Sequence, residues 1–231
     1  MTMGEGRGPA PRATARLAVA VLAAAFSFAP SRAAGQVFQG SAGSFVVQRR
    51  FSYRGEVSEQ AAVLYGCEGS VRVGRVRLGV SGFAGAFGAD TMAPISAVRV
   101  RTTAVTLHVA VSRDIQLGVR AEGRRFAADA GVAFWKLVGP DVRFEPEFGL
   151  TGLRGLVDVG LLRSSSVRGG AKMSSAVQTT LGAAYSPPGT PLRVVLAYRF
   201  ERYDIEATRV SAVRLEQFRG LVLEAGVQVG R

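Results

Sequence analysis

Cysteine and histidine are almost absent from this sequence of 231 residues, where each occurs once, as Cys67 and His108. A single cysteine excludes a disulfide framework, and the two residues together are too few for a zinc site of several cysteines and histidines. After residue 35 no segment approaches eighteen consecutive apolar residues, so no further membrane-spanning helix is expected. The sequence predicts no metal site, no cofactor and no catalytic residue.

Asparagine is absent and lysine occurs only as Lys136 and Lys172, so 27 of the 29 basic residues are arginine. The net charge of +12 comes from arginines that are scattered along the chain, with no basic cluster or basic helix. Nucleic-acid binding is therefore not expected. The 48% of hydrophobic residues indicates a folded chain, and the 29 glycines argue against a helix-rich one.

The first 35 residues have the pattern of a secretory signal peptide. Arg7, Arg12 and Arg16 precede an apolar run from Leu17 to Pro30, and small residues follow it. About fourteen apolar residues are too few for a comfortable membrane span. We expect cleavage after Ala33 or Gly35, with a retained N-terminal anchor as the alternative. The domain prediction is a signal peptide over 1–35 and a single β-domain over 36–231.

The remainder of the chain alternates apolar and polar residues with period two. In Ile115–Glu122, Ile115, Leu117 and Val119 share one face while Gln116 and Arg120 share the other. This periodicity predicts strands rather than helices. Counting such runs gives about ten strands, near 44–54, 70–87, 96–112, 114–126, 128–138, 142–151, 154–163, 174–186, 190–203 and 214–230, and merging two weak ones gives eight. The residues before Ser44 are expected to form a short exposed lead-in.

Turn-forming residues separate these runs. Short turns are predicted at 112–114, 139–141 and 186–189, the last of which reads Ser-Pro-Pro-Gly. Longer polar loops are predicted for Glu56–Gly69, Arg163–Ser174 and Asp204–Val213. Within 97–111 the apolar phase slips, which a bulge near Thr102 and Thr103 would explain, as would a strand end beyond the buried band.

Alternation alone leaves open whether the apolar face packs inward or meets lipid. Glycines on the polar face suit the crowded interior of a small barrel; they are Gly118, Gly149, Gly182, Gly220 and Gly226. Aromatic residues near strand ends suit the girdles of a membrane barrel; they are Tyr53, Trp135, Tyr185, Tyr198, Phe200 and Tyr203. Both features favour an apolar face that points outward into lipid.

From Phe45 to the C-terminus this pattern resembles the small outer-membrane β-barrel proteins of diderm bacteria. The resemblance implies an all-β fold, an antiparallel up-and-down transmembrane β-barrel of eight to ten strands, in the cell outer membrane. It implies outer-membrane lipids, lipopolysaccharide and the barrel-insertion machinery as partners, and it leaves the oligomeric state open. The chain ends in Arg231, where that family usually has an aromatic residue.

Few residues of the sequence are candidates for catalysis or covalent chemistry. His108 and Ser112 lie about 13 Å apart if they share a strand, too far for a hydrogen bond, so His108 is expected to be a lumen or core residue. A serine on a neighbouring strand remains the alternative. Glu145 and Glu147 are expected to face the same side and to pair with Arg120 or Arg99. Cys67 is expected to be inert or to pair between molecules.

The leading functional prediction is an integral outer-membrane barrel with a structural, adhesive or narrow-transport role carried by its longer loops, and no enzymatic activity. Within those loops, residues 168–172 carry Arg168 and Lys172, which could contact lipopolysaccharide. One alternative is a soluble periplasmic or secreted barrel that binds a small apolar ligand. A lipid-directed hydrolase centred on His108 is a further alternative.

Overall fold

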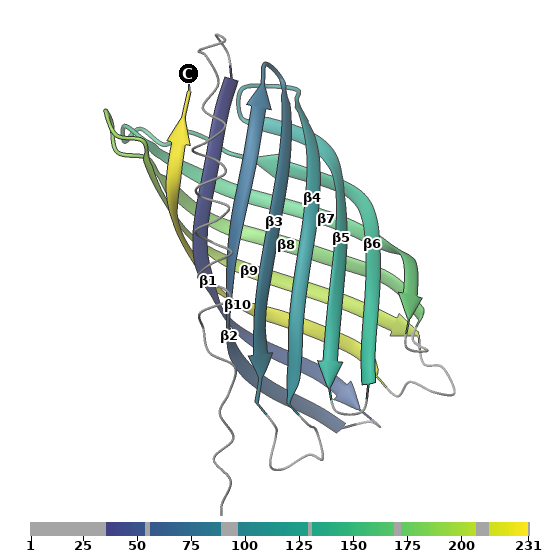
Figure 1. Ribbon diagram of the computed structural model, residues 1–231. Coiled ribbons are helices and arrows are strands. Elements are labelled where there is room, and N and C mark those ends of the chain that lie inside the picture. The colour runs from purple at the N-terminus through teal and green to yellow at the C-terminus, as the bar shows by residue number, and fades with distance from the viewer. Residues whose placement is uncertain are drawn as a thin grey trace, which may run out of the picture.

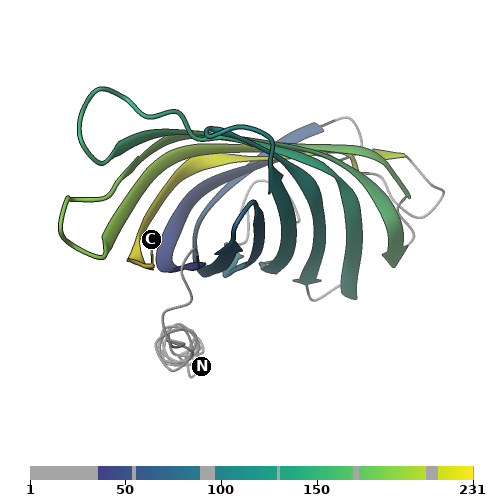
Figure 2. The ribbon, with the colours of Figure 1, turned by 90° about the horizontal axis from the view of Figure 1, so that it is seen from above.

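Ten antiparallel strands form a closed barrel (Figure 1). The computed structural model describes residues 36–53, 56–88, 97–128, 131–168, 172–206 and 213–230, so the predicted signal peptide lies outside the described residues. The strands are β1 (Gln36–Tyr53), β2 (Glu56–Val73), β3 (Val76–Phe87), β4 (Val98–Ala110), β5 (Ile115–Ala128), β6 (Gly131–Phe144), β7 (Leu153–Arg168), β8 (Lys172–Tyr185), β9 (Leu192–Glu206) and β10 (Val213–Val229). Each strand pairs with its neighbour in sequence, and β1 pairs with β10 to close the ring, which curves around a common interior when seen from above (Figure 2).

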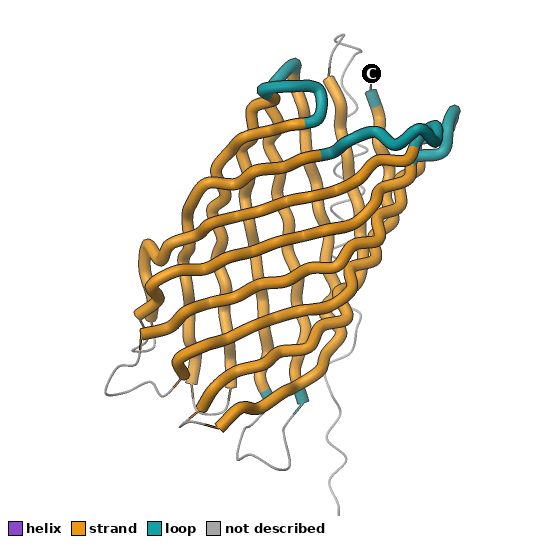
Figure 3. The backbone as a smooth tube through the Cα atoms, turned by 180° about the vertical axis from the view of Figure 1, so that it is seen from behind, coloured by secondary structure: helices purple, strands orange, loops and turns teal. Residues whose placement is uncertain are grey.

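The two ends of the barrel differ in their connections. We call the end that carries Gln36 and Gly230 the terminal end, and the opposite one the far end. The turns 74–75, 111–114, 145–152 and 186–191 lie at the terminal end, where Figure 3 shows the more prominent described loops. The strands are 12 to 18 residues long, and a transmembrane β-strand needs only about 9–11. Every strand is therefore long enough to cross a membrane.

The apolar face of the strands points outward, away from the barrel. Large apolar side chains are exposed all around the wall, for example Leu181 at 49%. They include Val46, Val63, Leu78, Val80, Val105, Leu107, Leu117, Val119, Leu196, Leu221 and Leu223. Such a belt on a closed barrel is the surface that a membrane-spanning barrel presents to lipid. No described segment is a helix long and apolar enough to cross a membrane.

The predicted number of ten strands is confirmed, although two boundaries were wrong in opposite directions. The run 70–87 contains the end of β2 and all of β3, which are separated by a turn at Gly74 and Arg75 with Gly74 at a φ of 58°. The predicted turn 139–141 instead lies inside β6, where Pro140 points outward. Proline lacks the N–H of a ladder bond, and the pairing of β6 with β7 is interrupted at Gly139 and Pro140.

Two segments predicted to be irregular are strands. Glu56–Gly69 belongs to β2 and pairs along its whole length with β1. Its lumen-facing positions hold polar or small residues such as Gln60 and Gly66, which made it resemble a loop. The prediction of an exposed lead-in before Ser44 is also wrong, because β1 begins at Gln36. The loops predicted at 163–174 and 204–213 shrink to the connections 169–171 and 207–212, which lie outside the described residues.

The phase slip in β4 has neither of the predicted causes. Register is continuous on both sides of Thr102 and Thr103, so no bulge is present. Val98 and Val100 lie within the strand and point into the barrel, where they are buried. The lumen is apolar at that level and polar further along, so the inward face changes character while the strand keeps its phase.

Four of the five glycines assigned to the polar face do face the lumen, as predicted; Gly149 lies instead in the connection 145–152. All four sit where the neighbouring backbone comes very close. A Cβ added at Gly220 would lie 1.8 Å from the carbonyl oxygen of Val46, and one at Gly118 would lie 2.2 Å from that of Leu107. Glycine is therefore required at both positions by the close approach of adjacent strands.

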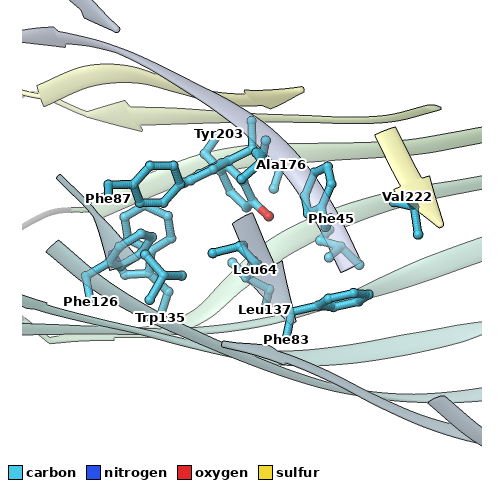
Figure 4. Close-up of a cluster of buried hydrophobic side chains, with 14 of the residues drawn as sticks. Phe45, Leu64, Phe83, Phe87, Phe126, Trp135, Leu137, Ala176, Tyr203 and Val222 are labelled. Atoms are coloured by element: carbon cyan, nitrogen blue, oxygen red, sulfur yellow. The ribbon is translucent and has the colours of Figure 1, made fainter. Parts of the chain in front are cut away.

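An aromatic plug fills the lumen toward the far end (Figure 4). Its rings are Phe45, Phe83, Phe87, Phe126, Trp135, Tyr203 and Phe218. Trp135 packs on Phe126 with ring centroids 4.5 Å apart and on Tyr203 at 5.4 Å. The girdle prediction is thus wrong for Trp135 and Tyr203, which are buried in the barrel, whereas Tyr185 and Tyr198 are exposed on its outside.

Candidate functional site: the polar interior of the barrel

A polar cavity of about 670 Å³ opens at the terminal end of the barrel, and we call it the vestibule. Arginine, glutamate and glutamine side chains line it, including Arg72, Arg77, Gln116, Glu145, Glu147, Arg154 and Arg193. The next space along the lumen measures about 70 Å³, and the one beside the plug about 10 Å³. The described lumen therefore narrows from an open vestibule to a closed far end.

Glu145 forms the centre of the vestibule floor. It follows the last residue of β6, and its Oε1 lies 2.8 Å from Nη2 of Arg143 and 3.4 Å from Nη2 of Arg193. Nη1 of Arg77 lies 3.8 Å from its other oxygen. Burial opposes ionisation of this carboxyl, but the three arginines outweigh it and lower its pKa to about 2. Glu145 is therefore a fixed negative charge.

The predicted pairing of Glu145 and Glu147 is wrong in its details. Glu145 pairs with Arg143, Arg77 and Arg193 rather than with Arg120 or Arg99. Glu147 lies on the rim outside the strands and pairs with Arg113 and Arg154. The β6 strand ends at Phe144, so the strand alternation that placed both carboxylates on one side does not extend to them.

Below the floor, Arg120 bridges two buried aspartates. Its Nη2 donates to Oδ1 of Asp158 at 2.6 Å, and its Nε lies 3.1 Å from Oδ1 of Asp141. The other oxygen of Asp141 is 2.6 Å from Nε2 of His108. Because all four side chains point into the lumen from β4, β5, β6 and β7, the cluster ties four neighbouring strands together. Each buried charge has an oppositely charged partner, as burial of a charge requires.

His108 has an orienting carboxylate but no nucleophile. Its Nδ1 makes no hydrogen bond with a described residue. Ser112 lies in the exposed turn after β4, where its Oγ accepts from the backbone N–H of Ile115 at 3.1 Å. His108 is only 1% exposed and faces the lumen, away from lipid. The expectation of a lumen or core histidine is confirmed.

A third cluster lies beside the plug. Arg124 donates to Oε2 of Glu201 at 2.6 Å and lies 3.2 Å from Oε1 of Glu122. Gln178 donates to the other oxygen of Glu122 at 2.7 Å, and the Tyr203 hydroxyl donates to Glu201 at 3.0 Å. Tyr203 thus belongs to both the plug and the polar network, and it joins them.

A last ion pair lies at the far side of the plug. Nε of Arg49 donates to Glu216 at 2.6 Å, and its Nη1 donates to Gln60 at 3.0 Å. The guanidinium of Arg49 also stacks over the ring of Phe51 at 4.5 Å and lies 5.7 Å from that of Phe87. This arrangement places a cation on the electron-rich faces of aromatic rings and adds a further layer to the closure.

Sequence reasoning missed most of this network. It named His108, Arg120 and Glu145, but it assigned no lumen role to Asp141, which it placed in a turn. The signal was present as charged residues two apart on the inward phase, such as Glu122 with Arg124. Partners lie on other strands, 77 residues apart for Arg124 and Glu201 and 167 apart for Arg49 and Glu216, and only the strand register brings them together.

Within the described residues, no group of three or more histidine, cysteine, aspartate and glutamate side chains is arranged to hold a metal ion. Cys67 lies half-buried in β2, opposite Ala42 and Gly82, as a free thiol. The polar interior is therefore a set of ion pairs around arginine.

No protein-family model and no curated protein sequence matches this chain. Among solved structures it is similar to the outer membrane protease OmpT from Escherichia coli, with 10% identity, a TM-score of 0.48, and 87% of this chain and 99% of that one covered. Neisserial surface protein A has 11% identity, a TM-score of 0.36, and coverage of 86% and 98%. Ail, the attachment invasion locus protein of Yersinia pestis, has 12% identity, a TM-score of 0.34, and coverage of 84% and 99%.

At such low identities and TM-scores, these similarities carry no inference about what this chain does. The fold rests on the chain's own strand pairing, which closes a ten-stranded antiparallel barrel. Its apolar outer wall and ion-paired lumen are the features that water-filled or side-chain-filled outer-membrane barrels share. This chain therefore has the pattern of a small outer-membrane β-barrel.

Proposed function

We propose that this chain is a closed outer-membrane barrel with a structural role, rather than a channel. The observation that carries the proposal is the occlusion of the lumen, which falls from a vestibule of about 670 Å³ to about 10 Å³ at the plug. A barrel of ten strands has little more interior than its side chains fill. Here those side chains are cross-linked by ion pairs, so solute passage would require breaking several of them at once.

Conductance across a planar bilayer tests this proposal. The purified barrel, inserted into bilayers, is expected to give no stable conductance steps, and its gel mobility with and without heating should verify that it is folded. A variant with the plug emptied by Phe87→Ala, Phe126→Ala and Phe218→Ala serves as a comparison, because any leak should grow when the far-end closure is removed. Regular conductance steps from the unmutated protein would overturn the structural role in favour of narrow transport.

Integration into the membrane is a separate requirement of the proposal. Because the exposed belt is apolar, the protein is expected to stay in the membrane pellet through carbonate and urea extraction. The alternative soluble barrel with an internal apolar ligand would be released. That alternative also requires an apolar cavity, whereas the vestibule is lined mainly by charged and polar side chains.

We also infer that the His108–Asp141 pair is structural rather than catalytic. The inference rests on the burial of His108 and on the absence of a described nucleophile at its Nδ1. His108→Ala should lower the unfolding free energy by about 1–3 kcal/mol, because it removes the nearer hydrogen-bond partner of one buried Asp141 oxygen. If the unmutated protein hydrolyses phospholipid and a folded His108→Ala protein does not, a catalytic role must be accepted.

The adhesive alternative depends on long exposed loops. Glu56–Gly69 is part of strand β2, and the connections at 54–55, 129–130 and 169–171 are only a few residues long, which leaves 88–97 and 207–212 as the longer connections at the far end. The structural role therefore stands as the function that the geometry supports best.

A further inference from the structure

Basic side chains on the outer wall lie only in its far-end half. The outward-facing ones are Arg50, Arg99, Arg101, Arg125, Lys136, Arg163, Arg202 and Arg219. Among the described outward-facing strand residues of the terminal half there is no charged side chain, and the positions there hold residues such as Leu78, Val109 and Leu117. The wall is therefore apolar at one level and basic at another.

Two parts of this basic level differ in how the charges are balanced. On the wall formed by β9, β10, β1 and β2, Glu59 lies 3.8 Å from Arg50 and 3.7 Å from Arg219. On the same wall, Nε of Arg202 donates to Asp204 at 3.1 Å. These arginines have carboxylates beside them on the outer surface.

On β4 and β5 the outward-facing arginines have no described carboxylate beside them. Arg99, Arg101 and Arg125, which we call the arginine triad, are exposed and make no ion pair with any described residue. Arg101 and Arg125 stand directly opposite each other across the two paired strands, and Arg99 is the next outward residue on β4. Like charges placed opposite on a sheet repel each other, so the arrangement calls for an anion between them.

The level of the triad indicates what kind of anion. Arg101 is the fourth residue from the far end of β4, and Arg125 is the fourth from the far end of β5. An arginine is costly at the midplane of a bilayer and nearly free near its interface. Toward the terminal end, the same wall continues past Thr103 and Gly123 to Val105, Leu107 and Val119. The triad therefore lies at headgroup depth, next to a surface suited to acyl chains.

We infer that the arginine triad binds the phosphate groups of a lipid in the far-end leaflet, with the acyl chains lying along Val105 and Leu107. The planar fork of an arginine guanidinium matches the oxygens of a phosphate, and two or three such forks bind it more strongly than one. Phosphorylated glycolipids of the lipopolysaccharide class carry both the phosphates and the chains. This inference rests on the proposed function, because it requires the barrel to be embedded in a membrane.

The test compares two sets of substitutions in the full-length protein. The triad variant carries Arg99→Gln, Arg101→Gln and Arg125→Gln, and the matched control carries Arg50→Gln, Arg202→Gln and Arg219→Gln on the opposite wall. Both variants lose three positive charges from the far-end half of the outer surface. Each is purified in detergent, and its binding of diphosphorylated lipid A is measured by native mass spectrometry and by the shift in unfolding temperature.

The unmutated protein should bind lipid A and unfold at a higher temperature with it. The triad variant should bind it about tenfold or more weakly, since several charge-assisted hydrogen bonds are lost, and the control should change by no more than about two- to threefold. Equal losses in the two variants, or no loss in either, would overturn the inference. Inorganic pyrophosphate serves as a probe without acyl chains, and if it stabilises the unmutated protein as much as lipid A does, the site is not a lipid site.

Failure of the inference can be separated from failure of the proposed function. Insertion of the proteins into phosphatidylcholine nanodiscs is measured before lipid A is added. If none of the three proteins enters the discs, the membrane-embedded role itself is wrong. If all three enter and lipid A does not distinguish them, only the arginine triad has lost its role.

Discussion

The two halves of the barrel interior differ in the kind of side chain that predominates, aromatic toward the far end and charged toward the terminal end. Toward the far end, the ring of Phe218 packs against those of Phe87 and Phe126, with centroids 6.0 and 6.3 Å away. Toward the terminal end, the inward faces of the strands carry ion pairs such as Arg120 with Asp158. The far half is closed by packing, whereas in the terminal half charge pairs surround the open vestibule.

This difference shows that an inward position on a membrane barrel need not be polar. Strand β5 carries Glu122, Arg124 and Phe126 in succession on its inward face, and so crosses from one half to the other. The stability of the packed half does not depend on the ionisation of its side chains. In the paired half, removal of a single charged group leaves its partner as an unpaired buried charge. The two halves should therefore respond differently to mutation and to pH.

The largest effect is expected where a buried charge loses its partner. Arg124→Ala leaves Glu201 and Glu122 with a missing cation and should lower the unfolding free energy by about 3–5 kcal/mol. The control is Arg202→Ala on the exposed outer wall, which should cost no more than about 1 kcal/mol. Urea unfolding in detergent or lipid measures both, and similar costs for the two would mean that the lumen is effectively solvated.

The paired half should also depend on pH through Glu145. Its pKa of about 2 in the folded barrel lies below its ordinary value of 4.5, so the stability it contributes is complete above about pH 4.5 and is lost as the pH falls toward 2. The contribution is on the order of 3 kcal/mol at neutral pH. The unmutated protein should exceed Glu145→Gln in stability at pH 7, and the gap should close by pH 2. A gap that is unchanged at pH 2 would contradict this account.

Within the packed half, replacing an aromatic ring by leucine should lower the unfolding free energy by less than breaking a buried ion pair does. Phe218→Leu removes ring contacts with Phe87, Phe126 and Tyr203 and is expected to cost about 2 kcal/mol at every pH. Phe200→Leu, on the outward face of β9, is its control and should cost much less. A cost for Phe218→Leu that varies between pH 7 and pH 4 would blur the distinction between the two halves.

The smallest effect is expected on the outer wall. Leu181→Trp places a larger apolar group against fluid lipid chains and should change stability by less than about 0.5 kcal/mol. The matched change Leu137→Trp, inside the barrel at 2% exposure, should cost about 1–3 kcal/mol through overpacking. Reversal of this order would place the packed core on the other side of the wall.

Alternation in the sequence predicted the class of fold, because strand period and turn chemistry are local properties. It succeeded for runs such as Ile115–Glu122, and it failed where the inward face changed from apolar to polar, as in β4. The errors at Glu56–Gly69 and at 139–141 have one cause, since polar, glycine or proline residues were taken for turns although the lumen and the outer wall accommodate them. Pairing between β1 and β10 closes the barrel across almost the whole chain, and no local pattern reports it.

The candidate site could be predicted only in part. The sequence indicated that His108 and Glu145 face a lumen with arginines, but ion-pair partners are set by register between strands. Trp135 was assigned to a membrane girdle because it lies toward the end of an apolar run. Its inward phase is visible only once β6 is known to continue through Pro140 to Phe144.

The central claim is that the apolar outer face of the barrel contacts lipid, whereas the lumen is closed and contains no lipid. Tryptophan quenching in brominated-lipid vesicles tests this claim most directly. Trp135 is the sole native tryptophan and is only 4% exposed, inside the plug. Its fluorescence in the unmutated protein should be quenched weakly. In a Trp135→Phe background, Leu181→Trp should be quenched several times more strongly. Strong quenching of Trp135 together with weak quenching at position 181 would contradict the account.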